Sequence, residues 1–450
     1  MELKNKKVLV FGAGKSGIGA SDLLAKAGAC PIIFEGNVNT KAEDVIAKTD
    51  GTYEVQVLIG ELPKEVKESL DLVVLSPGVP TDLPIVKSFY EMGLPVWGEV
   101  ELAYQTGKGK VLAITGTNGK TTTTALLGKI MSDAHDSVFV VGNIGTPYTS
   151  KSFEMQEDSI TVAEISSFQL ETSVTFAPAV SAILNITEDH LNRHHTMEEY
   201  IRVKELITQN QTKDDYCVLN YEDEVLREFG MHTVPKTVFF SSVRKLEEGI
   251  YLDGDQIILK TETEETPVVK TGDLKILGQH NYENVMAAVA MAYYAGVSME
   301  SIRKSVCEFT AVAHRIEYVT EKDGVVYYND SKGTNPDAAI KGIQAMNRPT
   351  LLIGGGYDKG SSYDEWIQAF DNKVRYLVLI GATKYAIKET AERLGFTNVI
   401  LCEDLQEAVA VCKEKAQPGD AVLLSPACAS WGQFDNYEQR GDKFKEYVLA

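Results

Sequence analysis

Residues 111–122 read Val111-Leu112-Ala113-Ile114-Thr115-Gly116-Thr117-Asn118-Gly119-Lys120-Thr121-Thr122. The apolar first half predicts a buried strand, and a helical pattern follows the glycine-rich turn. Such a turn points backbone N–H groups at phosphate oxygens, the lysine reaches the β- and γ-phosphates, and the hydroxyl after it can bind Mg²⁺. We therefore predict that an ATP-binding site is formed by Gly116, Thr117, Asn118, Gly119, Lys120, Thr121 and Thr122.

The spacing inside this loop is unusual. Only two residues separate Gly116 from Gly119, whereas the common phosphate loop GxxxxGK[ST] has four residues between its glycines. The loop comes directly after a predicted strand, which distinguishes it from an ordinary glycine-rich turn. The short spacing restricts the loop to fewer classes of nucleotide-binding protein. It does not change the prediction that the loop binds phosphate.

Length and composition limit the kind of protein. A chain of 450 residues is too long for one core and predicts about three domains. No run of about 18 apolar residues occurs and the first residues lack the apolar region of a signal peptide, so we expect no membrane insertion. The net charge of −20 argues against a nucleic-acid partner. Six cysteines without a CxxC pair are typical of reduced thiols, and we expect a cytoplasmic monomer.

Short apolar strands alternate with helical patterns along the whole chain. Strands such as Lys7–Phe11 and Asp71–Leu75 end at small or polar residues and lead into helices, which indicates parallel βαβ units. We predict an α/β fold of three domains. These are an N-terminal Rossmann-like domain at residues 1–107, a central phosphate-loop domain at 108–311 and a C-terminal Rossmann-like domain at 312–450.

Two polar clusters follow neighbouring strands of the central segment. Glu164 ends the strand Ile160–Ala163, and His190 lies just after the strand Val180–Leu184. Taken alone, Glu164 reads as a solvated helix start, and His190 as a capping or core histidine. Their common position beside a phosphate loop favours a metal site, because Mg²⁺ in such enzymes needs acidic oxygen ligands.

Further polar groups follow in the last 180 residues. Asn281 and Asn284 stand three residues apart at a helix start, where both amides could face one planar base, although one of them could instead cap the helix. Arg315 at a domain boundary suits a phosphate clamp. Asp330 opens Asp-Ser-Lys-Gly directly after a strand, a pattern that alone would indicate only a turn.

Taken in order, these motifs resemble those of the Mur ligases of peptidoglycan synthesis, and the resemblance covers essentially the whole chain. Its carriers are Thr115–Thr121, Gly142–Gly145, Glu164–Leu170, Asp189–His194, Gly278–Asn284, His314-Arg315 and Asn329–Asn335. The resemblance implies an ATP-dependent C–N ligase in cell-wall biogenesis. In this family ATP phosphorylates a carboxylate of a UDP-linked substrate, and an amine then attacks the acyl phosphate.

The resemblance also implies roles for particular residues. Lys120, Glu164, His190 and Lys204 would be catalytic, and two Mg²⁺ ions would be held by Thr121, Glu164, His190 and a CO2-derived carbamate on Lys204. Without the family, Lys204 reads as a plain surface lysine. The base, phosphates and ribose of ATP would contact Asn281, Asn284, Arg315 and Asp330.

Within the family, the stretch from Ser425 to Gly441 is similar to the branch that adds D-glutamate to UDP-N-acetylmuramoyl-L-alanine. The Asp-Asn-Pro-Arg motif of diamino-acid-adding relatives is absent. D-glutamate would be held by Lys332, Thr334, Lys359, Ser430, Trp431 and Tyr437. The UDP substrate would lie against Lys15, Ser16, Ser76, Pro77, Gly78 and Asn143. Gly36-Asn37 replaces the Thr-Arg pair common in the family, which puts the uracil contacts of that loop in doubt.

Other functions have weaker support in the sequence. Gly12-Ala13-Gly14-Lys15-Ser16-Gly17 matches a dinucleotide fingerprint, and Glu35 could bind a ribose, as in a dehydrogenase. Such an enzyme would have no use for the phosphate loop. A ligase of the same chemistry with another acceptor, including the folylpolyglutamate type, is the closest rival. A transport ATPase module or nucleotide switch is a third class.

Overall fold

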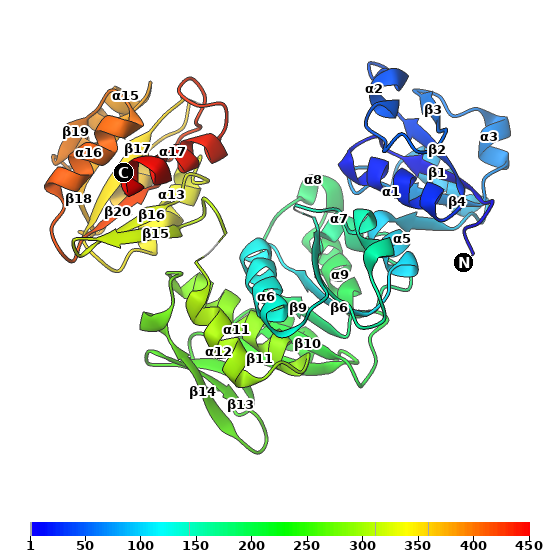
Figure 1. The fold of residues 1–450 in the computed structure, drawn as a ribbon, viewed down its shortest axis with the longest axis horizontal. Helices are drawn as coiled ribbons and strands as arrows, with labels where there is room; N and C mark the ends of the chain where they lie inside the picture. Colours follow the sequence, from blue (N-terminus) through cyan, green and yellow to red (C-terminus); the bar gives the residue numbers. More distant parts are fainter. Residues whose placement is uncertain (1, 144, 311, 359) are drawn as a thin grey trace. The chain divides into compact units, whose positions relative to one another are not determined.

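The computed structural model describes residues 2–143, 145–310, 312–358 and 360–450. These residues form sheets of five, nine and six strands, which confirms the predicted α/β class with three sheets. The described chain divides into two compact units (Figure 1). One comprises Met1–Val268 with Asn284–Ser305, and the other Val269–Glu283 with Val306–Ala450. The predicted boundaries at 107 and 311 stay predictions, and Ala311 itself lies outside the described residues.

The five-stranded sheet has the order β3-β2-β1-β4-β5, and all its pairings are parallel. Its strands are β1 Lys7–Phe11, β2 Cys30–Glu35, β3 Gln56–Ile59, β4 Leu72–Leu75 and β5 Val96–Gly98. Its helices are α1 Lys15–Lys26, α2 Ala42–Ile46, α3 Lys64–Glu68, α4 Pro84–Glu91 and α5 Glu99–Thr106. Two apolar clusters fill the two faces, one with Ile18 and Leu23 of α1 and the other with Val86 and Phe89 of α4.

A glycine permits the close approach of α1 to this sheet. A Cβ on Gly17 would lie 1.8 Å from the carbonyl oxygen of Gly12 and 2.7 Å from the Ser76 hydroxyl. The last glycine of the Gly12–Gly17 motif is therefore required by helix–strand packing, which is the role such a glycine has in βαβ units generally.

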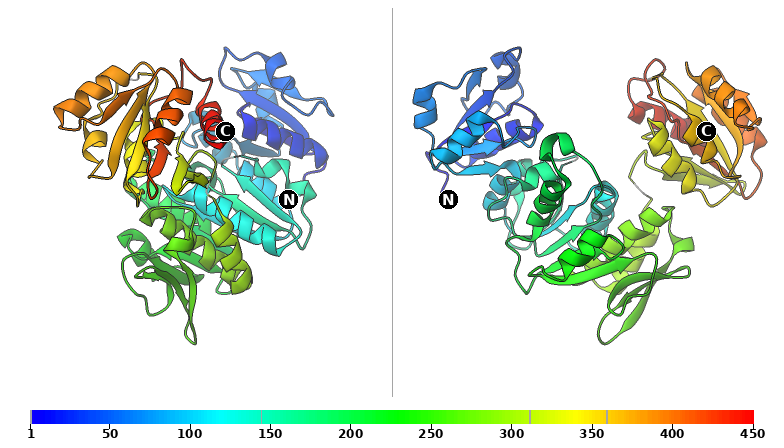
Figure 2. Two further views of the ribbon diagram at one scale, coloured as in Figure 1. Left: turned by 60° about the vertical axis from the view of Figure 1, so that its left-hand side comes forward. Right: turned by 180° about the vertical axis from the view of Figure 1, so that it is seen from behind.

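The nine-stranded sheet has the order β14-β13-β12-β11-β10-β9-β6-β8-β7. Its strands are β6 Lys110–Thr115, β7 Val138–Gly142, β8 Ile160–Glu164, β9 Val180–Ile183, β10 Tyr216–Asn220, β11 Lys236–Ser241, β12 Gly249–Asp253, β13 Gln256–Lys260 and β14 Glu265–Lys270. The strands from β7 to β12 pair in parallel, whereas β12 and β13 form an antiparallel hairpin. These last strands extend one edge of the sheet (green in Figure 2).

The helices that accompany this part of the chain are α6 Lys120–Ala134, η1 Tyr148–Ser150, η2 Ser152–Glu154, α7 Ser167–Leu170, α8 Leu191–His194, α9 Met197–Glu205, η3 Leu206–Thr208, α10 Glu224–Gly230, η4 Thr271–Asp273, α11 Gln279–Tyr294 and α12 Met299–Glu308. Tyr200 and Val203 of α9 pack with Ala113 of β6 and Ile183 of β9 in one apolar core. The sheet edge at the carboxyl end of β6 is therefore supported by α9.

The six-stranded sheet has the order β15-β16-β20-β17-β18-β19, with β15 antiparallel and the other pairings parallel. Its strands are β15 Glu317–Lys322, β16 Val325–Asn329, β17 Thr350–Gly355, β18 Val374–Ile380, β19 Val399–Leu401 and β20 Ala421–Leu424. Its helices are α13 Pro336–Gln344, α14 Asp364–Gln368, α15 Lys384–Arg393, α16 Leu405–Lys415 and α17 Tyr437–Leu449. Trp366 of α14 anchors one face, and Phe444 of α17 anchors the other.

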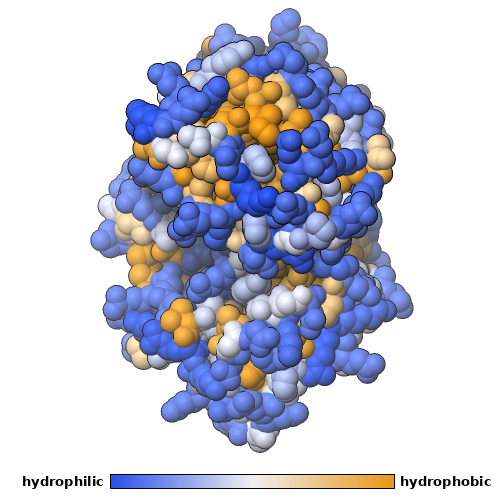
Figure 3. Space-filling model, turned by 90° about the vertical axis from the view of Figure 1, so that its left-hand side faces the viewer, coloured by the Kyte–Doolittle hydropathy of each residue, from blue (hydrophilic) through white to orange (hydrophobic). Residues whose placement is uncertain are grey.

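None of the described helices combines the length and the apolar character needed to cross a membrane. Polar and charged residues cover most of the face in Figure 3, and hydrophobic residues gather there only in limited areas. The many charged residues on this face agree with the net charge of −20.

Helix α5 joins the first two sheets. Its Leu102 belongs to the core of the five-stranded sheet, whereas its Val100 and Ala103 belong to the core of the nine-stranded one. Glu101 is fully buried, and its Oε2 accepts hydrogen bonds from the N–H groups of residues 174, 175 and 176 at 2.9, 3.0 and 3.1 Å. One carboxylate thus satisfies three backbone donors of the central segment.

Glu99 is the second buried carboxylate of α5. Its Oε1 accepts a hydrogen bond from Gln169 Nε2 at 2.6 Å, and its Oε2 is buried without a hydrogen-bond partner. Burial raises the pKa of Glu99 to about 7, although the hydrogen bond from Gln169 acts in the opposite direction. Glu99 is therefore protonated in the folded chain at a pH where it would be ionised after unfolding.

The three donors on Glu101 predict a large effect of its removal. We expect Glu101→Ala to lower the free energy of unfolding by about 3 kcal/mol or more, because three backbone N–H groups lose a charged acceptor. Urea unfolding followed by circular dichroism measures this. Glu157→Ala is the control, since the Glu157 side chain is 83% exposed. An unfolding midpoint of Glu101→Ala equal to that of Glu157→Ala would contradict the prediction.

The raised pKa of Glu99 predicts a pH-dependent stability. Below about pH 4.5 the Glu99 carboxyl is protonated in both the folded and the unfolded chain. As pH rises through 7, its favourable contribution to the free energy of unfolding is lost. The rise from 4.5 to about 7 corresponds to about 3 kcal/mol. We expect the melting temperature of wild type to fall relative to that of Glu99→Gln between pH 5 and pH 8. A constant difference across this range would show that Glu99 does not titrate as described.

Candidate active site

The phosphate loop joins β6 to α6 through two glycines in conformations that other residues rarely adopt. Gly116 has a φ of 145° and Gly119 a φ of 86°. A Cβ on Gly119 would also lie 2.3 Å from Asn284 Oδ1, so both backbone geometry and close packing require glycine there. Helix α6 begins at Lys120 directly after Gly119, and its N-terminus therefore opens at the loop, as anion binding requires.

Asn185 holds the loop in shape from the end of β9. Its carbonyl accepts a hydrogen bond from Thr117 N–H at 2.9 Å, and its Oδ1 accepts one from Asn118 N–H at 2.8 Å. Its Nδ2 donates to the Asn118 carbonyl at 3.1 Å. Sequence reasoning did not assign a role to Asn185. The only signal was a polar residue directly after a buried strand.

Two lysines converge on one carbonyl oxygen of the loop. The Nζ atoms of Lys120 and Lys204 donate to the Gly116 carbonyl at 2.8 and 2.9 Å. The Lys204 residue is only 2% exposed, and its Nζ lies 4.7 Å from the ring centre of Tyr200. Burial, and then the charge of Lys120, lower the pKa of Lys204 to about 7. The reading of Lys204 as a surface lysine is therefore wrong.

Glu164 and His190 lie on neighbouring strand ends. Glu164 ends β8 and is buried, and its Oε1 accepts a hydrogen bond from Asn143 Nδ2 at 3.1 Å. It is not a solvated helix start. His190 precedes α8 with a φ of 54° and makes no side-chain capping bond. Its ring packs on Phe168 with centroids 4.9 Å apart and is about half exposed, so it is not a core histidine. It is the N-cap residue of α8, but only its backbone carbonyl bonds to the helix.

The donor atoms near the loop fit a Mg²⁺ ion in kind. Thr121 offers a hydroxyl in the first turn of α6, and Glu164 offers a carboxylate at the same sheet edge. Over the described residues, no cluster of three His, Cys, Asp or Glu side chains is placed to bind a metal.

A cavity of about 560 Å³ lies between the first two sheets, within the first compact unit. The six residues predicted for the UDP substrate all line it: Lys15, Ser16, Ser76, Pro77, Gly78 and Asn143. Its wall also contains residues that were not among those predicted for the UDP substrate: Phe11, Gly12, Ala13, Gly14, Glu35, Gly36, Val79, Pro80, Leu83 and Gln169. The structure therefore brings distant predicted residues together around one space.

The polar groups of this cavity are already partly engaged. Glu35 accepts hydrogen bonds from the N–H groups of Ala13 and Asn37 at 3.0 and 2.9 Å. Lys15 Nζ donates to the Gly145 carbonyl at 2.6 Å. Glu35 thus holds the loops after β1 and β2 in place. This structural role differs from the ribose binding considered for a dehydrogenase.

In the second unit, Asp330 lies inside rather than at the surface. Its carboxylate accepts hydrogen bonds from Ser425 Oγ at 2.7 Å and from Ile316 N–H at 3.3 Å. Burial raises the pKa of Asp330 to about 7. Asn281, in the same unit, donates from Nδ2 to the Leu277 carbonyl at 2.7 Å. These contacts do not test the prediction that Asp330 and Asn281 bind ATP.

Two of the residues predicted for D-glutamate, Lys332 and Tyr437, meet at the start of α17. Lys332 Nζ lies 3.8 Å from the ring centre of Tyr437. Ser430 is buried, while Trp431 is about half exposed and packs on Tyr357 with centroids 5.4 Å apart. Thr334 lies in the loop after β16, two residues beyond Lys332, whereas Arg315 precedes β15 and its charge acts on both Lys332 and Tyr437. Lys359 lies outside the described residues.

Arg440 of α17 connects the two loops of this region. Its Nη1 donates to the Cys428 carbonyl at 3.0 Å, and its Nη2 donates to the Ser331 carbonyl at 2.8 Å. Its Nε donates to Ser331 Oγ at 3.0 Å, and the residue is fully buried. Arg440 belongs to the Ser425–Gly441 stretch, but no role of its own was predicted, because a buried arginine has no local signature.

Comparison with known proteins identifies the family. Models of three Mur ligase domains match the chain: the MurD-like N-terminal domain at residues 6–98, the middle domain at 114–292 and the glutamate ligase domain at 314–428. UDP-N-acetylmuramoylalanine--D-glutamate ligase of Lachnoclostridium phytofermentans is 56% identical, and the alignment covers 100% of this chain and 99% of that one. The enzymes of the same name from Lachnospira eligens and Clostridioides difficile are 54% and 44% identical over the same shares.

Solved structures share the fold at low identity. MurF of Acinetobacter baumannii aligns over 98% of this chain and 93% of its own with a TM-score of 0.61 and 17% identity. The UDP-N-acetylmuramate-alanine ligase MurC of Thermotoga maritima aligns over 99% of both chains with a TM-score of 0.58 and 19% identity. From the three domain models and the full-length relatives, the chain belongs to the Mur ligase family.

Proposed function

We propose that this protein is an ATP-dependent ligase that joins D-glutamate to UDP-N-acetylmuramoyl-L-alanine in peptidoglycan precursor synthesis. The full-length relatives named for this reaction support the choice of substrates. The convergence of Lys120 and Lys204 on the Gly116 carbonyl carries the proposal from the structure, because it builds a phosphate site next to a lysine with an unusually low pKa. ATP supplies the phosphoryl group in this family.

The reaction has two steps. An oxygen of the terminal carboxylate of the UDP substrate attacks the γ-phosphorus of ATP, and ADP leaves with the bond electrons. The amine of D-glutamate then attacks the acyl carbon, phosphate leaves, and the amine loses a proton, so that one amide replaces one acyl phosphate. Lys120 and the loop N–H groups would stabilise the charge on the transferred phosphoryl oxygens.

We assign the UDP part of the substrate to the cavity between the first two sheets. It is lined by Lys15, Ser16 and the Ser76–Gly78 turn, and Asn143 at its inner side also binds the Glu164 carboxylate. A substrate reaching past Asn143 would therefore approach the end of β8. The assignment of the nucleotide of ATP to Asn281, Asn284, Arg315 and Asp330 and of D-glutamate to Lys332, Thr334, Lys359, Ser430, Trp431 and Tyr437 rests on the family motifs.

Mg²⁺ belongs to the proposal as well. Thr121 and Glu164 would hold one ion, and Glu164, His190 and a carbamate on Lys204 a second. Bound Mg²⁺ would offset negative charge on the phosphoryl oxygens. An unmodified Lys204 ammonium would repel the ion, and its low pKa favours the neutral amine that can attack CO2, forming an N–C bond and releasing a proton. We also propose that the protein acts as a cytoplasmic monomer.

The activity predicts a strict dependence on two substrates. With ATP, Mg²⁺ and UDP-N-acetylmuramoyl-L-alanine, we expect phosphate release to rise at least about tenfold on adding D-glutamate, because the amine removes the acyl phosphate. L-glutamate and lysine serve as acceptor controls. Lys120→Ala should abolish release, whereas Lys129→Ala, on the same helix, should retain it. Release that is independent of D-glutamate, or equal with L-glutamate or lysine, would refute the assignment.

The low pKa of Lys204 predicts that its modification depends on CO2 and pH. With 13C-labelled bicarbonate at pH 8, we expect a carbamate signal in the 13C NMR spectrum that Lys204→Arg lacks and Lys129→Arg keeps. Because protonation increases as pH falls below about 7, the signal and the ligase rate should decline together there. An unlabelled Lys204 in an otherwise active enzyme at pH 8 would contradict the carbamate.

A further inference from the structure

Arg193 lies three residues after His190 and has no part in the proposed chemistry, yet it is one of the most constrained side chains near the cavity. Its Nη2 donates to Glu171 Oε2 at 2.6 Å, and its Nε donates to Glu171 Oε1 at 3.3 Å. The two side chains are only 11% and 10% exposed. A bidentate ion pair with so little solvent around it holds its geometry far better than a surface pair does.

The same guanidinium reaches across to the first domain. Its Nη2 also donates to the carbonyl oxygen of Val79 at 2.9 Å. Val79 lies in the turn that follows β4, and the residues Ser76 to Pro80 of this turn form part of the cavity wall. Arg193 is therefore bonded directly to the backbone of the wall, from a helix of the central segment.

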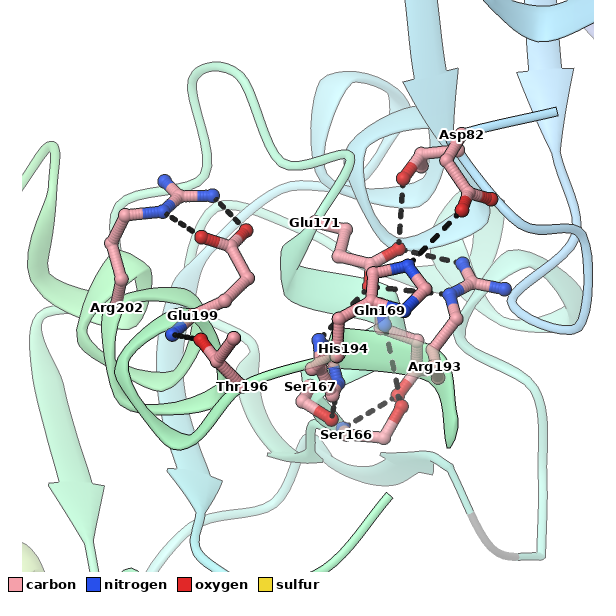
Figure 4. A network of polar contacts seen from close by, with 12 residues as sticks. Asp82, Ser166, Ser167, Gln169, Glu171, Arg193, His194, Thr196, Glu199 and Arg202 are labelled. Carbon is pink, nitrogen blue, oxygen red and sulfur yellow. Dashed lines mark hydrogen bonds and ion pairs between the residues drawn. The ribbon is translucent and has the colours of Figure 1, made fainter. Parts of the chain in front are cut away.

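Other contacts support this link on both sides. Thr81 Oγ1 donates to Glu171 Oε2 at 3.4 Å, and His195 Nε2 lies 3.2 Å from Asp82 Oδ2. Figure 4 shows Glu171, Arg193 and His194 grouped together in the central segment, with Asp82 of the first domain nearby. Three of the four residues from Val79 to Asp82 therefore contact side chains of the central segment.

The network also reaches the candidate metal ligand. The Arg193 guanidinium lies 5.0 Å from the ring centre of Phe168, and the His190 ring packs on the same phenyl ring. Glu171 additionally faces His194 Nδ1 at 3.3 Å, and His194 Nε2 is bonded to Ser167 Oγ at 2.9 Å. A shift of Arg193 would therefore disturb both the cavity wall and the support of His190.

We infer that Arg193 is a positioning residue for the UDP substrate: through the Val79 carbonyl and the Glu171 carboxylate it sets the distance between the Ser76–Pro80 wall of the cavity and the catalytic side chains of the central segment. The inference rests on the proposed placement of the UDP substrate in this cavity. Lysine can replace arginine only in part here, because a single ammonium lacks the planar fork that serves a carboxylate and a carbonyl together.

The test measures binding and kinetics of Arg193→Ala and Arg193→Lys in the full-length enzyme. We expect the Kd and KM for UDP-N-acetylmuramoyl-L-alanine to rise roughly tenfold or more in Arg193→Ala and by less in Arg193→Lys, because a charge-assisted link to the wall is lost. The KM for ATP should stay within about twofold of wild type, since the phosphate loop is held by Asn185 and not by Arg193.

Arg202 provides a matched control in the same region (Figure 4). It forms a similar bidentate pair with Glu199, at 2.8 and 2.6 Å, but is 58% exposed and is bonded within its own helix α9. Arg202→Ala should bind the UDP substrate as wild type does. A loss of UDP-substrate affinity in Arg202→Ala as large as in Arg193→Ala would overturn the inference, because any arginine removed from this region would then act alike.

A variant in the cavity lining distinguishes an error in the role of Arg193 from an error in the placement of the UDP substrate. Asn143→Ala changes a lining residue directly and should weaken UDP-substrate binding whatever Arg193 does. If Asn143→Ala binds weakly and Arg193→Ala binds as wild type, the cavity assignment stands and the positioning role is wrong. If neither variant changes the Kd, the cavity itself is wrongly assigned, and the inference falls with it. Should Arg193→Ala fail to fold, wild-type affinity in a folded Arg193→Lys variant would equally overturn the role.

Discussion

The parallel pairing of β6 with β8 on one side and β9 on the other is the constraint on which the central site depends. Ile114 pairs with Glu164, and Thr115 pairs with Ile183. Parallel strands end at the same edge of a sheet, so this register delivers the phosphate loop, Glu164 and Asn185 to one place. The hydrogen bonds of Asn185 to the loop then fix its shape.

The cavity depends on a second constraint, the attachment of the first domain to the central segment. Helix α5 shares its apolar side chains between two cores and places Glu99 and Glu101 in their joint interior. Glu101 satisfies three backbone donors, whereas Glu99 leaves one oxygen unsatisfied beside Gln169, which lines the cavity. Arg193 adds a polar link between the same two parts of the chain, through Glu171 and the Val79 carbonyl. A substrate cavity with walls from two sheets needs such links to keep its width.

The low pKa of Lys204 follows from the same architecture. Its ammonium is buried, and the nearest cation, Lys120, uses the same carbonyl oxygen. Two like charges on one acceptor in a buried place favour the neutral form of one of them. The fold thus favours the neutral amine of Lys204 next to the phosphate loop, and a neutral amine is the form that reacts with CO2 to give a carbamate.

The sequence by itself determined the α/β class, the phosphate loop and the family, because these rest on local patterns: strands ending in glycine-rich turns and motifs of a few residues. It also named all six cavity residues that the family motifs imply. It did not determine the roles of Asn185, Glu99, Arg193 and Arg440. Only the tertiary structure decided these, since hydrogen bonds between residues far apart in the chain leave no periodic trace in the sequence. The burial of Lys204, which changes its chemistry, was decided in the same way by packing against Tyr200 and the loop carbonyl.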